Sequence, residues 1–356
     1  MKKSLINIHL LEAWVNVYQT ISRSAIKCCE VIKKEHKNMS LKHVMELYEL
    51  MDSIYVNGEV VKDYLHNIDP SADVTVKTIK GDNGSTDFVR VLVKGKNGKS
   101  SGGSAPTLGI IGRLGGIGAR PEMTGFVSDG DGALACMASA AKTIDMALKG
   151  DQLEGDVIFT THICPTAPTL PHEPVPFMNS PVDISVMNEN EVDEMMDAIL
   201  SIDTTKGNQI CNHKGFAITP TVKEGYILKV SDDLLHVYTQ SAGISPVVMP
   251  ITTQDITPYG NGLFHVNSIL QPAVATTSPV VGVAITTESV VAGCATGATH
   301  VTDVENVVRF VLEVAKVYGA KKCAFYDEKQ FALIEILYGS MNHLQTKGNE
   351  VPAHEQ

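Results

Sequence analysis

Short apolar runs recur along the chain and alternate with longer segments that have helical spacing. The apolar runs have the length of strands buried on both faces, and they occupy residues 107–112, 156–161, 198–202 and 280–285. Residues 133–149 and 303–318 carry apolar positions at helical spacing, with Gly150 as a stop and Thr302 as a cap. Buried strands alternating with capped helices predict an α/β fold, namely a three-layer α/β/α sandwich with a mostly parallel, mixed sheet.

The pattern also predicts three regions along the chain. Residues 1–38 form an N-terminal helical extension, in which Leu11, Trp14, Tyr18, Ile21, Ala25, Cys28 and Ile32 follow a heptad spacing. This helix could self-associate, pack on its own body, or precede a natural start at Met39. Residues 39–345 form a single α/β domain that includes a hairpin at 73–80 and 86–94, and residues 346–356 form a polar tail.

Composition narrows the classes of partner. The chain has 29 Lys and Arg against 40 Asp and Glu, which gives a net charge of −11, so a general nucleic-acid binder is disfavoured. A hydrophobic content of 44% excludes disorder as the main state. Seven scattered cysteines do not form a disulfide framework, and no apolar stretch is long enough for a membrane span. We expect a soluble, cytoplasmic protein whose partner is a small molecule, with no nucleic acid and no membrane.

Polar side chains that can perform chemistry follow the predicted strands. They are Arg113, Asp129, Asp131, His162, Cys164, Asp203, Glu288 and His300. Ligands of open α/β sheets bind at the carboxyl ends of the strands, so these residues predict a shared metal site or acid–base site. Each residue alone has a structural explanation, because a strand-end aspartate often caps a helix and His300 lies just before one.

Other chemistries are possible for parts of this set. Cys164 lies two residues after His162, and on a strand the two side chains would face the same side, as a cysteine–histidine nucleophile requires. Asp131 could act as a base, neutralise Arg113 or cap its own helix. The glycine-rich segment 112–118 lacks the spacing of a dinucleotide-binding loop, so nucleotide binding is disfavoured.

The order of the strand-end residues resembles that of the co-catalytic zinc aminopeptidases and related deacylases. Asp129-Gly130-Asp131 is similar to their bridging-aspartate element, Asp203 to a later ligand, and His300 to their last histidine. Two positions depart from that pattern. Arg113-Leu114-Gly115 stands where the family has His-x-Asp, and Thr161-His162 stands where it has a glutamate pair.

The match is closer to a bacterial family catalogued only as a domain of unknown function. Residues 39–344 resemble that family through the segments GIIGRLGGIGARPE, THICPTAPT, SIDTTKGN and PITTQDITPYGNG. This resemblance implies a zinc-aminopeptidase-like fold and no established activity.

Three functions follow as hypotheses. The first is a metal-dependent hydrolase of an amide or related C–N bond in a small nitrogenous compound. One divalent metal (zinc, manganese or nickel) would be held by Asp129, Asp203, His300 and His162. The catalytic candidates are His162, Asp131 and Cys164, and the substrate-binding candidates are Arg113, His265 and Glu288, with Arg113 holding a substrate carboxylate through its planar fork.

The second hypothesis is a metal-free enzyme or ligand-binding protein on the same fold, in which Arg113 supplies positive charge in place of the metal. The third is a thiol-based amidase or isomerase that uses Cys164 and His162. We also expect a homo-oligomer, both from the heptad spacing near the N-terminus and from the oligomeric habit of the resembled peptidases.

Overall fold

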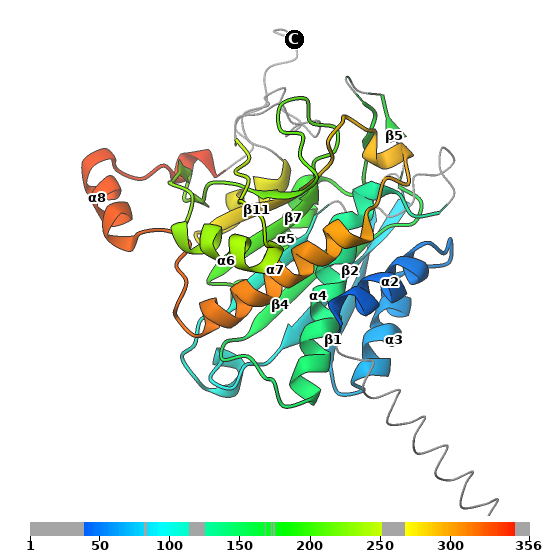
Figure 1. Cartoon of the computed structure of the whole chain (residues 1–356), viewed down its shortest axis with the longest axis horizontal. Helices are drawn as coiled ribbons and strands as arrows, with labels where there is room; N and C mark the ends of the chain where they lie inside the picture. Colours follow the sequence, from blue (N-terminus) through cyan, green and yellow to red (C-terminus); the bar gives the residue numbers. More distant parts are fainter. Residues whose placement is uncertain are drawn as a thin grey trace, which may run out of the picture.

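A computed structural model describes residues 39–81, 84–113, 125–167, 169–171, 173, 175–250 and 268–345 (Figure 1). The predicted N-terminal helix at 1–38 and the polar tail at 346–356 lie outside these residues. His265 lies outside them as well.

A nine-stranded mixed sheet runs through the described part of the chain. Its order is β1-β2-β4-β3-β7-β11-β9-β10, with β8 paired to β11. The strands are β1 (Asp73–Gly81), β2 (Gly84–Val93), β3 (Leu108–Gly112), β4 (Val157–Ile163), β7 (Ala198–Thr204), β8 (Gly215–Ile218), β9 (Val222–Lys223), β10 (Tyr226–Ile227) and β11 (Val280–Thr286). The predicted α/β fold with a mixed sheet is confirmed.

The parallel part of this sheet is its centre. β4, β3, β7 and β11 are parallel neighbours, whereas β1–β2, β2–β4, β11–β8, β11–β9 and β9–β10 pair antiparallel. The four central strands are buried along almost their whole length, which accounts for their continuous apolar runs. The predicted hairpin is present as β1 and β2.

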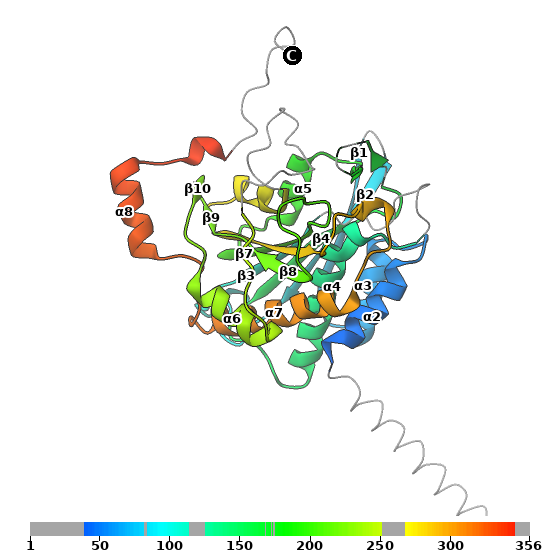
Figure 2. The ribbon, with the colours of Figure 1, turned by 45° about the horizontal axis from the view of Figure 1, so that its top comes forward.

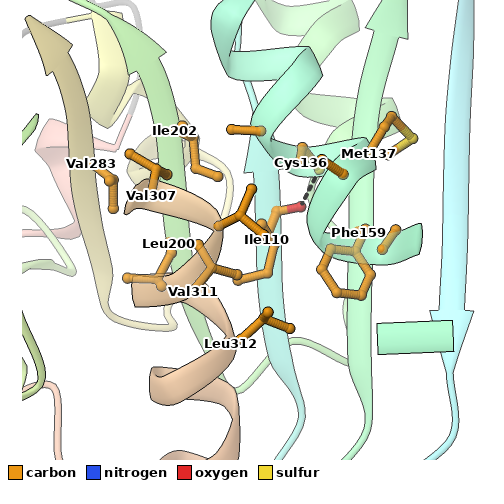
Figure 3. Close-up of a cluster of buried hydrophobic side chains, with 14 of the residues drawn as sticks. Ile110, Cys136, Met137, Phe159, Leu200, Ile202, Val283, Val307, Val311 and Leu312 are labelled. Carbon is orange, nitrogen blue, oxygen red and sulfur yellow. Dashed lines mark hydrogen bonds between the residues drawn. The ribbon is translucent and has the colours of Figure 1, made fainter. Parts of the chain in front are cut away.

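Helices cover the two faces of the sheet unequally. On one face lies α7 (Val301–Gly319), whose Val307 and Val311 pack against Ile110, Leu200 and Val283 of the central strands (Figure 3). The same apolar cluster takes residues from α2 (Ser40–Met51), α3 (Gly58–Ile68), α4 (Asp131–Leu148), α6 (Asp232–Ala242) and α7 (Val301–Gly319). The opposite face of the sheet packs against η4 (Ser268–Val274). The same face is hydrogen-bonded to α5 (Ile184–Glu191), because the Thr160 hydroxyl of β4 donates to Glu191 O. This thinner layer lies over the site described below.

Two helices differ from their predicted limits. The sequence pattern predicts a helix near 191–197, but α5 begins after Asp183, whose carboxylate accepts the N–H groups of Ser185 and Val186, and it ends at Glu191. The last helix is predicted to reach residue 344, but α8 (Glu328–Tyr338) ends at Gly339, whose φ of 79° breaks the helix.

The remaining elements are short. They are η2 (Lys99–Ser101), η3 (Ser128–Gly130), β5 (Thr169–Leu170), β6 (Phe177–Met178), η5 (Gly293–Ala295) and η6 (Asn342–Leu344). No helix in the described ranges has the length and apolarity needed to cross a membrane. The five cysteines in those ranges are free thiols.

The connections between the strands reverse direction between β3 and β7. After β3 the chain passes through α4 to β4 on one side, and after β7 it continues to strands on the other side. Ligands of α/β sheets bind at such a switch point, outside the carboxyl ends of the strands. Arg113 follows β3, and His162 and Asp203 lie near the carboxyl ends of β4 and β7, so these three residues lie at this edge.

Candidate active site

Arg113 is a fully buried cation at the end of β3. Its backbone N–H donates to Ile202 O at 2.7 Å, so the residue is level with Asp203 on the neighbouring strand β7. Its side chain has 0% exposure and turns towards α5, where Nη1 donates to Glu191 Oε2 at 2.6 Å and to Asn188 Oδ1 at 3.3 Å. Two other nitrogens, Nε and Nη2, are buried and have no hydrogen-bond partner among the described residues.

Glu191 joins Arg113 to His162. Its second oxygen, Oε1, lies 2.5 Å from Nδ1 of His162 on β4, and both side chains are buried. Burial alone would raise the pKa of Glu191, but the charges of Arg113 and His162 hold it below its usual value. The imidazole also lies against the Phe88 ring, with 5.5 Å between centroids. His162 is therefore fixed in a buried triad with Glu191 and Arg113.

A second buried ion pair lies at the start of α4. Lys206, three residues after Asp203, donates from Nζ to Asp131 Oδ2 at 2.6 Å and to Ala298 O at 2.7 Å. Thr299 donates to the other Asp131 oxygen at 2.6 Å. Lys206 is 1% exposed and Asp131 is 0% exposed. Asp131 is thus a buried carboxylate paired with Lys206 and Thr299.

A glycine brings the start of α4 close to the strand ends. A Cβ atom on Gly132 would lie 2.7 Å from Arg113 O and 2.7 Å from Ile202 O, closer than any side chain can approach a backbone. Only glycine therefore lets the first turn of α4 rest on β3 and β7. This contact holds Asp129 and Asp131 at the same edge as Arg113 and Asp203.

Asp129 has a strongly perturbed acidity. It is 5% exposed, and burial raises its pKa to about 7, with further raising by the charge of Asp203 and opposition from Lys206. Burial also raises the pKa of Asp131, which Lys206 and Thr299 oppose. A carboxyl group with a pKa near neutrality can both accept and donate a proton at working pH.

The predicted four-ligand metal set is not brought together. His162 is bound to Glu191, His300 is exposed as the N-cap residue of α7, and the Lys206 ammonium lies among the aspartates. Within the described ranges, no group of three or more His, Cys, Asp or Glu side chains is placed to hold a metal ion. Asp129 and Asp203 are close enough to interact electrostatically, but the residues present do not fit a complete metal site.

The other predicted site residues are dispersed. Cys164 is buried in a separate apolar cluster with Val127 and Met178, and burial raises the pKa of its thiol. The thiol–imidazole pair is not formed, because His162 Nδ1 bonds to Glu191 while the Cys164 thiol donates to Ser85 O. Glu288 is an exposed residue two positions after β11.

The sequence interpretation missed Glu191, Asn188 and Lys206. Glu191 sits in the acidic run Asn188-Glu189-Asn190-Glu191, where nothing distinguishes the buried carboxylate from its exposed neighbour. Lys206 had a usable signal, because it follows a buried strand at the edge where Asp203 was selected.

Comparisons with known proteins give a family and a distant structural similarity. The model of the family described as "Protein of unknown function (DUF1177)" matches residues 77–348. The solved structure titled "Bottromycin maturation enzyme BotP in complex with Mn" is 12% identical, with a TM-score of 0.48, covering 80% of this chain and 72% of that one. No curated protein matches the chain.

Proposed function

The chain belongs to the family described as "Protein of unknown function (DUF1177)", and we propose that it binds a small carboxylate-bearing molecule at the β3–β7 edge. On this proposal, it acts on an amide or related C–N bond of that molecule by acid–base chemistry. The ligand class rests on Arg113. The bond class rests on the resemblance of the strand-end motifs to those of the aminopeptidases and deacylases.

The free edge of the Arg113 guanidinium is the observation that carries the proposal. Nη1 is occupied by Glu191 and Asn188, whereas Nε and Nη2, which form one edge of the planar group, are buried without a partner in the described part of the chain. Leaving such donors unpaired costs free energy, about 1–3 kcal/mol for each buried group. A carboxylate accepts two parallel hydrogen bonds from this edge, so it would satisfy both nitrogens at once.

Glu191 gives the arginine its orientation. It neutralises the guanidinium charge, and with Asn188 it fixes Nη1, so the free edge is held in one direction before a ligand arrives. Such preorganisation lowers the entropy cost of binding. Arg113 and Glu191 therefore form a neutral, rigid receptor for an anion in place of a mobile surface charge.

Asp129 is the acid–base group of the proposal. In its ionised form it would take a proton from the water that attacks the amide carbonyl carbon, and it would then give that proton to the departing nitrogen. The products are a carboxylic acid and an amine, which exchange one proton to become a carboxylate and an ammonium, so the atoms balance with water as the only co-reactant. A pKa of about 7 suits both steps.

Metal-dependent hydrolysis remains a second candidate. The observation in its favour is the electrostatic interaction of Asp129 with Asp203, because a divalent cation would relieve the repulsion between two buried carboxylates.

Arg113→Lys is expected to weaken the binding of small carboxylates about tenfold or more. Lysine keeps a positive charge beside Glu191 but offers no planar edge, so the bidentate pair with the ligand is lost. Calorimetric titration with butyrate, against butyramide as the neutral analogue, measures the effect. The titration is run with and without added zinc, manganese or nickel.

Arg90→Lys is the matched control, because Arg90 pairs with Asp193 in a partly exposed ion pair beyond the end of α5. Its butyrate affinity should equal that of the unaltered protein. Equal binding of butyrate and butyramide, or unchanged binding in Arg113→Lys, would refute the carboxylate role. Butyrate binding that appears only with added metal would favour the metal-dependent candidate.

A further inference from the structure

In the described part of the chain, three fully buried polar side chains from the end of β3, from β7 and from η4 have hydrogen-bonding atoms without a partner. They are Arg113 (Nε and Nη2), Ser201 (Oγ) and Gln271 (Nε2 and Oε1), and each is 0% exposed. Buried polar atoms in native proteins are nearly always paired with protein, water or ligand. A group of such atoms on one face of one sheet points to a bound polar molecule.

Asn188 and the strand register link these residues. Asn188 accepts from Arg113 Nη1 through Oδ1 and donates from Nδ2 to the backbone oxygen of Gln271, both at 3.3 Å. Gln271 lies in η4, which packs on β7 and β11. Ser201 pairs with Ile111, two residues before Arg113, and the alternation along β7 places it on the η4 face.

We infer that Gln271 recognises a carboxamide on the molecule whose carboxylate Arg113 binds. The glutamine amide has one unpaired donor and one unpaired acceptor, and a carboxamide offers the complementary pair. Ser201 can add a hydrogen bond to either atom. The inference rests on the proposed function and narrows its substrate class to small acids that carry an amide group.

Mono-amides of dicarboxylic acids are the test ligands. Succinamate and butyrate match in length and share a carboxylate, but only succinamate carries an amide. We expect succinamate, or its homologues malonamate and glutaramate, to bind about tenfold or more tightly than the matched fatty acid. Gln271→Leu should abolish this preference and leave butyrate affinity unchanged.

The unfolding temperature of Gln271→Leu is a second measurement, which needs no ligand. Leucine replaces an amide with two unpaired atoms by an apolar group of similar size, so the free protein should unfold at an equal or higher temperature. Gln240→Leu, at an exposed position on α6, is the control and should retain the amide preference. If butyrate binds but no mono-amide binds more tightly, the Gln271 inference alone fails. If no carboxylate binds at all, the proposed function fails with it.

An independent observation concerns α8. After its polar first three residues this helix, with sequence EKQFALIEILY, has apolar side chains on nearly every side and one charged residue, Glu335, yet only Phe331 is buried. Figures 1 and 2 both show it standing out from the body of the molecule. Leu333, Ile336, Leu337 and Tyr338 are 53%, 80%, 61% and 73% exposed. A helix that is hydrophobic all round is normally buried.

We propose that α8 is the contact between two copies of this chain. The four side chains expose on the order of 500 Å² in each copy, which is more than half of the roughly 800 Å² that each partner contributes to a standard interface. A groove of about 450 Å³ lies beside the helix, lined by Ile227, Val230, Phe331 and Ile334 together with polar residues that include Asp232, Asp233 and Asp327. Because helix and groove are adjacent, a twofold axis would bring each helix against the groove of the other copy.

Light scattering of the full chain at micromolar concentration tests this contact. We expect a mass of at least twice 38.3 kDa for the unaltered protein and 38.3 kDa for the double variant Ile336→Glu, Leu337→Glu. Leu148→Glu, at a position 56% exposed on α4, should keep the larger mass. A monomeric unaltered protein, or a double variant that keeps the larger mass, would overturn the proposal.

Discussion

Replacing Lys206 by methionine is expected to lower the free energy of unfolding by about 3–5 kcal/mol. The change removes the only ammonium that bonds to Asp131 in the described residues and leaves that carboxylate buried with Thr299 alone. Methionine has nearly the length of lysine, so the effect is electrostatic and no large cavity is left. Urea unfolding followed by circular dichroism measures it.

The expected loss of unfolding free energy in Lys206→Met is larger at high pH than at low pH. Without Lys206 the pKa of Asp131 would rise further, because burial is its largest raising influence and the ammonium opposes it. A carboxyl with a raised folded-state pKa favours folding at low pH, and this contribution is lost as pH rises through the folded pKa. The variant should therefore lose more stability at pH 8 than at pH 5.

Two control variants distinguish the effect of breaking the buried ion pair from the effect of removing a lysine in general. Lys229→Met breaks an exposed ion pair with Asp232, where the side chains are 67% and 74% accessible, and should change stability by less than about 0.5 kcal/mol. The double variant Lys206→Met, Asp131→Asn removes both charges and should recover much of the loss. If Lys206→Met is as stable as the unaltered protein, the buried pair does not exist as described.

Asp129→Asn is expected to stabilise the protein at neutral pH. Ionising Asp129 opposes folding, because its pKa rises from 3.8 to about 7 in the folded chain. This cost is absent below pH 4, grows as pH rises towards 7 and then levels off, at up to about 4 kcal/mol. Asparagine removes it, so the gain in unfolding free energy should appear between pH 4 and pH 7.

Asp156→Asn is the matched comparison for this gain. Asp156 is 1% exposed, and its carboxylate accepts N–H groups from Gly95 and Ser100 and the Ser100 hydroxyl, so the same substitution there should destabilise. A residue whose removal stabilises the fold is typical of a functional site. Equal stability of Asp129→Asn and the unaltered protein at pH 5 and pH 8 would refute the raised pKa and, with it, the acid–base role.

The apolar pattern was sufficient to predict the sheet and its central strands. Each run at 107–112, 156–161, 198–202 and 280–285 corresponds to a strand, because a parallel strand between two layers must be apolar on both sides. The same reasoning placed Arg113, Asp129 and Asp203 at one edge, since the carboxyl ends of parallel strands meet there.

Only the tertiary structure decided which charge neutralises which. Glu191 is separated from Arg113 by 78 positions and from His162 by 29, and Lys206 is separated from Asp131 by 75. The hydrophobic periodicity of the sequence predicts where strands end. It does not predict which charged side chain, on a helix or loop distant in sequence, pairs with a residue at a strand end. A buried arginine with one edge occupied and the other free is therefore a property of the packed layers. The sequence by itself determined that a cation stands at this edge.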